Sequence, residues 1–183
     1  NSRCQMGIQG ALVAIAHNAV TEDAFKLMNG LGRLLAGQAK YDEALTWYEM
    51  ALAGFVEKGE EFTAATYNNM ASVYANQSEY TKALAFYDKS LAINLKVFGS
   101  DHPSTAENYG NMASVYSNQG KYTQALAFYN KSLAIHLKTL GPDHPSTATT
   151  YGGMASVYNK QGEYSQALAF YDKSLAIDLK TLG

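Results

Sequence analysis

Residues 67–74 read Tyr-Asn-Asn-Met-Ala-Ser-Val-Tyr, and the same frame returns as Tyr-Gly-Asn-Met-Ala-Ser-Val-Tyr at 109–116 and Tyr-Gly-Gly-Met-Ala-Ser-Val-Tyr at 151–158. Each copy begins 42 residues after the one before it. A second segment, Tyr-Thr-Lys-Ala-Leu-Ala-Phe-Tyr at 80–87, also returns near Tyr122 and Tyr164. A fixed period of about 20 to 50 residues is typical of stacked arrays of small units. The sequence therefore predicts a solenoid, with its function on a surface that the repeats share rather than in one pocket.

Each repeat carries the apolar pattern of two helices. Tyr67, Met70, Ala71 and Tyr74 stand at i, i+3, i+4 and i+7, which is one face of an α-helix, and a second helical pattern starts at Tyr80. Glycine follows each long second helix, where it relieves a left-handed conformation, and a proline then starts the next first helix, where its missing N–H costs nothing. The predicted helices are 60–77, 80–98, 103–119, 122–140, 145–161 and 164–182.

A diverged repeat precedes these three. Residues 41–48 align with 80–87, but at an offset of 39 residues, and the linker 59–61 lacks proline. The first helix of this repeat is predicted at 22–38, with Thr21 as its N-cap. Residues 5–19 show helical spacing and predict one more helix. The predicted organisation is an edge-covering N-terminal helix in 1–20, followed by four repeats at 21–59, 60–101, 102–143 and 144–183.

The spacing of large, small and aromatic residues in 67–74 and 83–87 resembles the tetratricopeptide repeat signature. The proline that ends a repeat of about 34 residues in that family is missing here. The 42-residue period, the linker Leu-Gly-Pro-Asp-His-Pro at 140–145 and the string Asn-Asn-Met-Ala at 68–71 look like the kinesin light chain type of this repeat. The resemblance covers 22–183. It implies an all-α, right-handed superhelical solenoid of antiparallel helix pairs, whose concave side holds a peptide.

Composition narrows the range of partners and locations. The net charge is -2 and 16% of the residues are charged, so there is no basic stripe for nucleic acid and no polybasic patch for a membrane. The longest apolar stretch, 11–16, is too short to span a bilayer. Cys4 is the only cysteine, which fits a reducing, cytoplasmic location. Because the chain lacks a first methionine and stops at a repeat boundary, we expect it to be part of a longer protein.

The residues that could suggest catalysis or metal binding are better explained by structure. All fourteen tyrosines stand at repeat-register positions, which indicates packing between helices, and Trp47 replaces a repeated phenylalanine. His102 and His144 lie in linkers beside prolines, which favours a turn-and-cap role over a metal site. His17 and His136 have no partner at ligand spacing. We therefore predict no catalytic residues, no metal, no cofactor and no enzymatic activity.

The polar residues of the first helices that differ between repeats are the candidate binding residues. Asparagine suits peptide capture because its amide offers both a donor and an acceptor. Asn69 and Asn111 match the second asparagine of the family's string, while Gly153 breaks the match, so the fourth repeat would contribute less or admit a bulkier group. The alternative is that these residues are merely solvated. The predicted peptide-binding residues are Arg33, Asn68, Asn69, Ser72, Asn76, Asn111, Ser114, Asn118 and Lys160.

The predicted function is a scaffold that binds a protein or peptide ligand, as in kinesin light chain-like adaptor or cargo recognition. Two other functions fit the pattern. The array could be a structural spacer that associates end to end, because the last helix ends in an apolar edge that includes Leu168, Phe170 and Leu175. It could also be a regulatory sensor array of a larger multidomain protein.

Overall fold

The computed structural model describes residues 22–55 and 60–182, and within these ranges the chain is all helical, with eight helices and no strand. The predicted helix at 5–19 lies outside the described residues. Each of the three 42-residue repeats has its two helices at the predicted positions, and the first helix in each ends one residue earlier than predicted. The helices are α2 (Glu22–Gly37), α3 (Tyr41–Phe55), α4 (Glu60–Asn76), α5 (Tyr80–Val97), α6 (Pro103–Asn118), α7 (Tyr122–Thr139), α8 (Pro145–Lys160) and α9 (Tyr164–Leu182).

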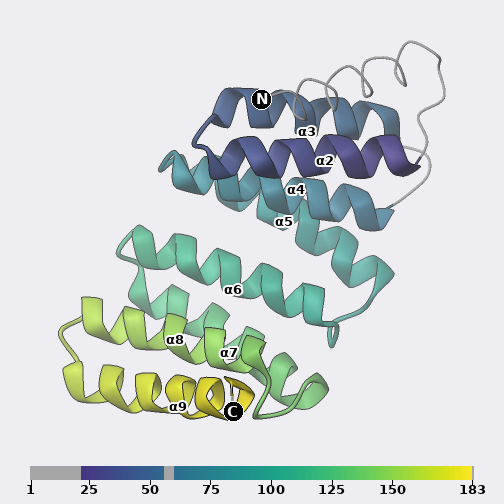
Figure 1. The fold of residues 1–183 in the computed structure, drawn as a ribbon. Coiled ribbons are helices and arrows are strands. Elements are labelled where there is room, and N and C mark those ends of the chain that lie inside the picture. The colour runs from purple at the N-terminus through teal and green to yellow at the C-terminus, as the bar shows by residue number, and fades with distance from the viewer. Residues whose placement is uncertain (1–21, 56–59, 183) are drawn as a thin grey trace. The chain divides into compact units, whose positions relative to one another are not determined.

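The chain divides into two compact units, which meet in sequence between Ser90 and Leu91. The N-terminal unit contains α2, α3, α4 and the first part of α5, and α2 packs on α3. The C-terminal unit contains the end of α5 and α6 to α9. Within it, α6 pairs with α7 and α8 pairs with α9, each pair running antiparallel (Figure 1).

Small residues at fixed places allow the helices to approach each other closely. The alanine inside each eight-residue string of the first helices is fully buried, and so is the matching alanine near the start of each second helix. A methionine beside the first of these fills the remaining space in each repeat. These residues are Ala71, Ala113, Ala155, Ala83, Ala125, Ala167, Met70, Met112 and Met154, all between 0% and 4% exposed.

The tyrosines of the first helices pack on the phenylalanine of the second helix in the same repeat. In α8 and α9, Phe170 stacks on Tyr158 with ring centroids 5.4 Å apart and meets Tyr151 at 6.0 Å. Lys173 covers the outer side, 4.9 Å from the Phe170 centroid. The two preceding repeats contain the same aromatic–lysine stack. The packing role predicted for these tyrosines is confirmed, and Trp47, at 9% exposed, is also part of a core.

The outer face of α9 carries exposed apolar side chains, as the sequence predicts for Leu168 and Leu175, which are 63% and 55% exposed. Tyr164, Tyr171 and Leu179 are exposed on the same helix. Phe170 corrects the prediction, because it is half-buried in the aromatic–lysine stack of its own repeat instead of lying on the exposed edge.

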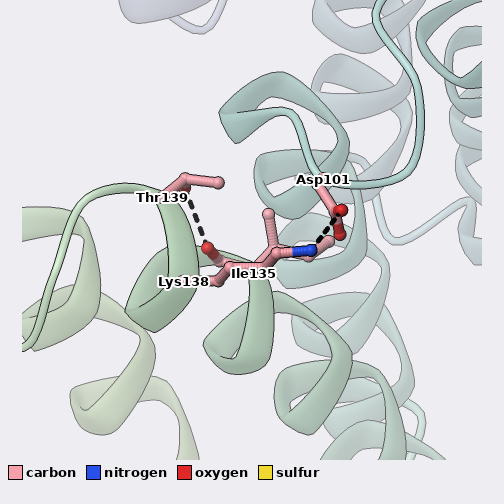
Figure 2. A network of polar contacts seen from close by, with 4 residues as sticks. All are labelled: Asp101, Ile135, Lys138 and Thr139. Atoms are coloured by element: carbon pink, nitrogen blue, oxygen red, sulfur yellow. Dashed lines mark hydrogen bonds and ion pairs between the residues drawn. The ribbon is translucent and has the colours of Figure 1, made fainter.

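Side-chain hydrogen bonds and ion pairs hold the linkers that precede α6 and α8. Thr147, which is fully buried, donates from Oγ1 to the Gly141 carbonyl oxygen at 2.9 Å, and Gly141 has a φ of +90°. Thr105 makes the same contact to Gly99. Figure 2 shows the exposed ion pair between Lys138 in α7 and Asp101 in the linker before α6. Lys180 and Asp143 form the matching ion pair in the linker before α8, so both contacts occur in both of these linkers, next to the start of α6 and α8.

Candidate functional site

In the N-terminal unit, the predicted asparagines form a polar chain between α2 and α4. Asn69 donates from Nδ2 to Asn29 Oδ1 at 2.8 Å. Asn29 in turn donates to Thr66 Oγ1 at 3.4 Å, and that hydroxyl donates to the Phe62 carbonyl oxygen at 2.9 Å. The Asn69 amide therefore already serves as a link between two first helices. The sequence predicts Asn69 as a binding residue, but it does not reveal this hydrogen bond between α4 and α2.

Ser72 is also engaged. Its hydroxyl donates to the Asn68 carbonyl oxygen at 3.1 Å and lies 2.9 Å from the Tyr87 hydroxyl. Because the single Ser72 proton is used, Tyr87 is the donor in that second bond. Burial raises the pKa of Tyr87, and the bond to Ser72 opposes the rise. Ser72 therefore positions the buried Tyr87 side chain, and it also belongs to the predicted binding face of the first helices.

Of the remaining predicted residues of this unit, Asn68 is half-buried, whereas Arg33 and Asn76 are exposed. Arg33 lies close enough to Tyr48 to act on it electrostatically. Burial raises the pKa of Tyr48 to about 12, and the Arg33 charge opposes that rise. In the N-terminal unit the predicted residues are therefore spread along α2 and α4.

The C-terminal unit contains a cavity of about 610 Å³ between two successive first helices, α6 and α8, and the second helix α7. It brings Asn111 and Ser114, both predicted, together with residues from the other two helices. Six of its eleven lining residues carry a hydroxyl group, although carbon atoms contribute more than half of the lining surface. The lining residues are Glu107, Gly110, Asn111, Ser114, Tyr129, Ser132, His136, Ser146, Thr149, Thr150 and Gly153.

Two residues of the cavity wall, Ser132 and His136, come from α7 and were missed by the sequence reasoning. They are 1% and 4% exposed. His136 Nδ1 lies 3.1 Å from Thr150 Oγ1. A signal was available in the sequence, since residues 94, 136 and 178 are Asn, His and Asp within otherwise closely similar second helices. All of the predicted binding residues lie on first helices, whereas position 136 lies on a second helix.

Lys160 and Asn118 contact each other rather than standing apart as two separate ligand contacts. Lys160 Nζ donates to Asn118 Oδ1 at 3.0 Å and to Ser117 Oγ at 3.1 Å. The lysine therefore ties the end of α8 to the end of α6. Neither Lys160 nor Asn118 lines the cavity.

The structure explains why residue 153 is a glycine, which the sequence alone did not reveal. A Cβ atom at this position would stand 2.5 Å from Cζ of Tyr129, which is only 9% exposed. The tyrosine ring thus takes the space that a side chain at 153 would need. The expected room for a bulkier ligand group at this position is filled by Tyr129.

The histidines of the linkers act as caps, as predicted. His102 Nδ1 accepts from the Ser104 backbone N–H at 3.2 Å, and His144 Nδ1 accepts from Ser146 at 3.1 Å. Among residues 22–55 and 60–182, no group of three or more His, Cys, Asp or Glu is placed to hold a metal ion. None of the described helices combines the length and the apolar character needed to cross a membrane.

Acidification is expected to destabilise the chain through His136. Burial, and secondarily the nearby His144, hold the pKa of His136 below its usual value of 6.5. The unfolded chain therefore takes up this proton first as the pH falls, so the stability due to neutral His136 is present above about pH 6.5 and is lost below it. We expect urea unfolding to show this loss between about pH 7 and about pH 5.

The control for this titration is His136→Asn, which places in α7 the residue found at position 94 of α5. It retains His102, His144 and Glu107, the other titratable groups around the cavity and its linkers. The variant is expected to lose less stability than the parent chain over the same interval. Parallel pH profiles for the two proteins would contradict the assignment.

The helix pairs, their linkers and the polar cavity define an α-helical repeat protein. A tetratricopeptide repeat model matches residues 62–136 and 105–180, and a second tetratricopeptide repeat model matches 26–57. These matches cover more than half of the sequence. The chain belongs to the tetratricopeptide repeat family.

Solved structures agree with this fold. BtubC (BKLC) from P. vanneervenii superposes with a TM-score of 0.81 at 17% identity, covering 98% of this chain and 72% of that one. A putative kinesin light chain from Podosopora anserina with nearly identical TPR-like repeats gives 0.76 at 21% identity, covering 98% and 86%. MamA gives 0.59 at 20% identity, covering 86% and 80%. The fold is thus a tetratricopeptide array. A search of curated proteins gave no match.

Proposed function

We propose that this chain is a protein-interaction scaffold that holds a peptide or partner helix along the polar faces of its first helices. The tetratricopeptide fold supports protein–protein interaction in general. The finer proposal is an adaptor that recruits a cargo in the cytoplasm, without catalytic activity of its own.

The observation that carries this proposal is the composition of the cavity between α6 and α8. Asn111, Ser114 and Thr149 supply amide and hydroxyl groups from two successive first helices. An amide can donate to and accept from a peptide backbone whatever side chains it carries, and Thr149, whose proton goes to the Pro145 carbonyl oxygen, can accept. Ser114 and Thr149 are exposed, so a ligand can reach them from solvent. A cavity that spans two repeats suits a ligand that extends along the array.

The proposal is tested by selecting peptides from a random displayed library on the full chain and measuring their affinities for variants. Asn111→Ala is expected to weaken binding of the selected peptides about threefold to tenfold, which is the range for one lost hydrogen bond. The matched control is Asn130→Ala, which removes the same group from an exposed position on α7 that is not part of the cavity wall.

The thermal midpoint of each variant is recorded alongside, because Asn111 also has contacts inside the protein. A set of peptides that bind both variants as tightly as the parent chain would place the binding surface elsewhere and refute the proposal for this face.

Self-association is the second candidate, and the exposed apolar face of α9 favours it. In α7 the residues at the same places as Leu168 and Tyr171 are half-buried Leu126 and buried Tyr129, and α8 packs on α7. The α9 face therefore has the shape that receives another helix. Sedimentation over a range of concentrations separates the candidates, since a monomer at all concentrations would exclude association through this face.

A further inference from the structure

The cavity wall contains two buried polar atoms that no other group satisfies. Ser132 Oγ and His136 Nε2 have no hydrogen-bond partner within the described parts of the chain. Both side chains line the cavity and both are more than nine-tenths buried. A buried polar group without a partner is costly, so a ligand group that satisfies such atoms gains affinity from them.

The Ser132 hydroxyl differs from its two counterparts in the neighbouring repeats, Ser90 and Ser174. Ser90 donates to the Ala64 carbonyl oxygen at 2.8 Å, and Ser174 donates to the Ala148 carbonyl oxygen at 2.9 Å. Ser132 stands at the same place in the repeat but makes no such bond. The first-helix residue beside it is Gly110, where a Cβ atom would lie 3.5 Å from Ser132 Oγ. Gly152 stands in the same way beside Ser174, at 3.7 Å, so the neighbouring glycine alone does not distinguish Ser132 from its counterparts.

The chemical character of His136 Nε2 follows from its neighbour. Thr150 Oγ1 donates its single proton to the Ser146 carbonyl oxygen at 2.9 Å, so it can only accept from His136 Nδ1. In the neutral imidazole the proton is therefore on Nδ1, and Nε2 carries a lone pair. The deep part of the cavity thus presents one acceptor and one hydroxyl, and it lacks a complementary donor.

The only formal charge among the lining residues is the carboxylate of Glu107, which is exposed. The ligand group that best fits an acceptor, a hydroxyl and a carboxylate is a cation with several donors. A guanidinium group has five N–H donors in a rigid plane and is more weakly hydrated than an ammonium group, so it loses less on entering a partly enclosed site.

We infer that the cavity between α6, α7 and α8 binds an arginine side chain of the peptide ligand. The guanidinium donates to His136 Nε2 and Ser132 Oγ, which lie just beneath the cavity surface and become accessible when the side chains around them shift, and the Glu107 carboxylate balances its charge at the rim. This inference rests on the proposed peptide-binding function and names the side chain that the site selects.

The test is an NMR titration of the full chain with acetyl-Gly-Ser-Arg-Ser-Gly-amide, following the side-chain nitrogen resonances of its histidines. The Nε2 resonance of His136 should start as an unprotonated nitrogen and shift as the arginine is added. His102 and His144 are internal controls, because their Nδ1 atoms are already hydrogen-bonded in linkers. The same peptide with citrulline, which has a similar shape but no charge, is expected to bind about threefold to tenfold more weakly.

Substitutions test which side chains of the cavity contact the arginine. Glu107→Gln and Ser132→Ala are each expected to weaken the arginine peptide about threefold to tenfold. Glu49→Gln removes a carboxylate from an exposed position on α3 and should have no effect. If the arginine and citrulline peptides bind equally, or His136 does not respond, the inference is overturned. The peptide-binding function still stands in that case if library-selected peptides lose affinity for Asn111→Ala, and falls with it if they do not.

Discussion

Gly153→Ala is expected to destabilise the chain, although alanine is the better helix former. A Cβ atom at 153 would lie 2.5 Å from the buried Tyr129 ring, and overpacking of this kind costs about 1–3 kcal/mol. The gain in helix propensity returns only about 1 kcal/mol. The net change in free energy of unfolding is therefore expected to be a loss of up to about 2 kcal/mol, measured by urea denaturation.

The neighbouring residue provides the control. A Cβ atom at Gly152 would meet Ser174 Oγ at 3.7 Å, which is ordinary contact, so Gly152→Ala should raise stability by about 0.5–1 kcal/mol. The two variants differ by one position and are expected to change stability in opposite directions. Equal stabilisation by both would mean that Tyr129 moves aside without cost, and the wall of the cavity would then be soft.

Thr147→Val is expected to lower the free energy of unfolding by about 1–2 kcal/mol, because it removes the hydroxyl that holds the linker before α8. Thr147 is fully buried and its Oγ1 donates to the Gly141 carbonyl oxygen at 2.9 Å. Valine has nearly the same shape and helix propensity as threonine, so the difference reports the lost hydrogen bond.

Thr149→Val makes the same chemical change two residues further along α8. Thr149 is exposed, and its bond to the Pro145 carbonyl oxygen can be replaced by water. This variant should remain within about 0.5 kcal/mol of the parent chain. If Thr149→Val lowered the free energy of unfolding as much as Thr147→Val, the buried hydrogen bond to the linker would not be the cause of the loss.

Much of the fold could be predicted because the repeat fixes it. The spacing of Tyr67, Met70, Ala71 and Tyr74 identifies a helix face, and its return after 42 residues identifies the stacking, so every helix of the three regular repeats was located. The place of Phe170 was missed because an apolar residue near a helix edge can pack on either side. Phe170 is half-buried because its ring stacks on Tyr158, and this contact joins two different helices.

The site was only partly predictable, for a related reason. Asn111 and Ser114 lie on the wall of the cavity as first-helix residues facing one side. His136 and Ser132 reach the same cavity from α7, and only the packing of α7 under two first helices brings them there. Lys160 was expected to meet a ligand, but its long side chain spans to Ser117 and Asn118. Contacts between repeats depend on how the helices pack in space, and the spacing of residues along the sequence does not give that packing.

The aromatic–lysine stacks have a consequence for the evolution of the gene. Each stack is closed within one helix pair, as Tyr151, Tyr158, Phe170 and Lys173 are in the last repeat. A duplication or deletion of 42 codons therefore adds or removes a complete stack and leaves the others intact. The array can lengthen or shorten by whole repeats through unequal recombination, while substitutions at the polar positions of the first helices change the surface of one copy without disturbing its stack.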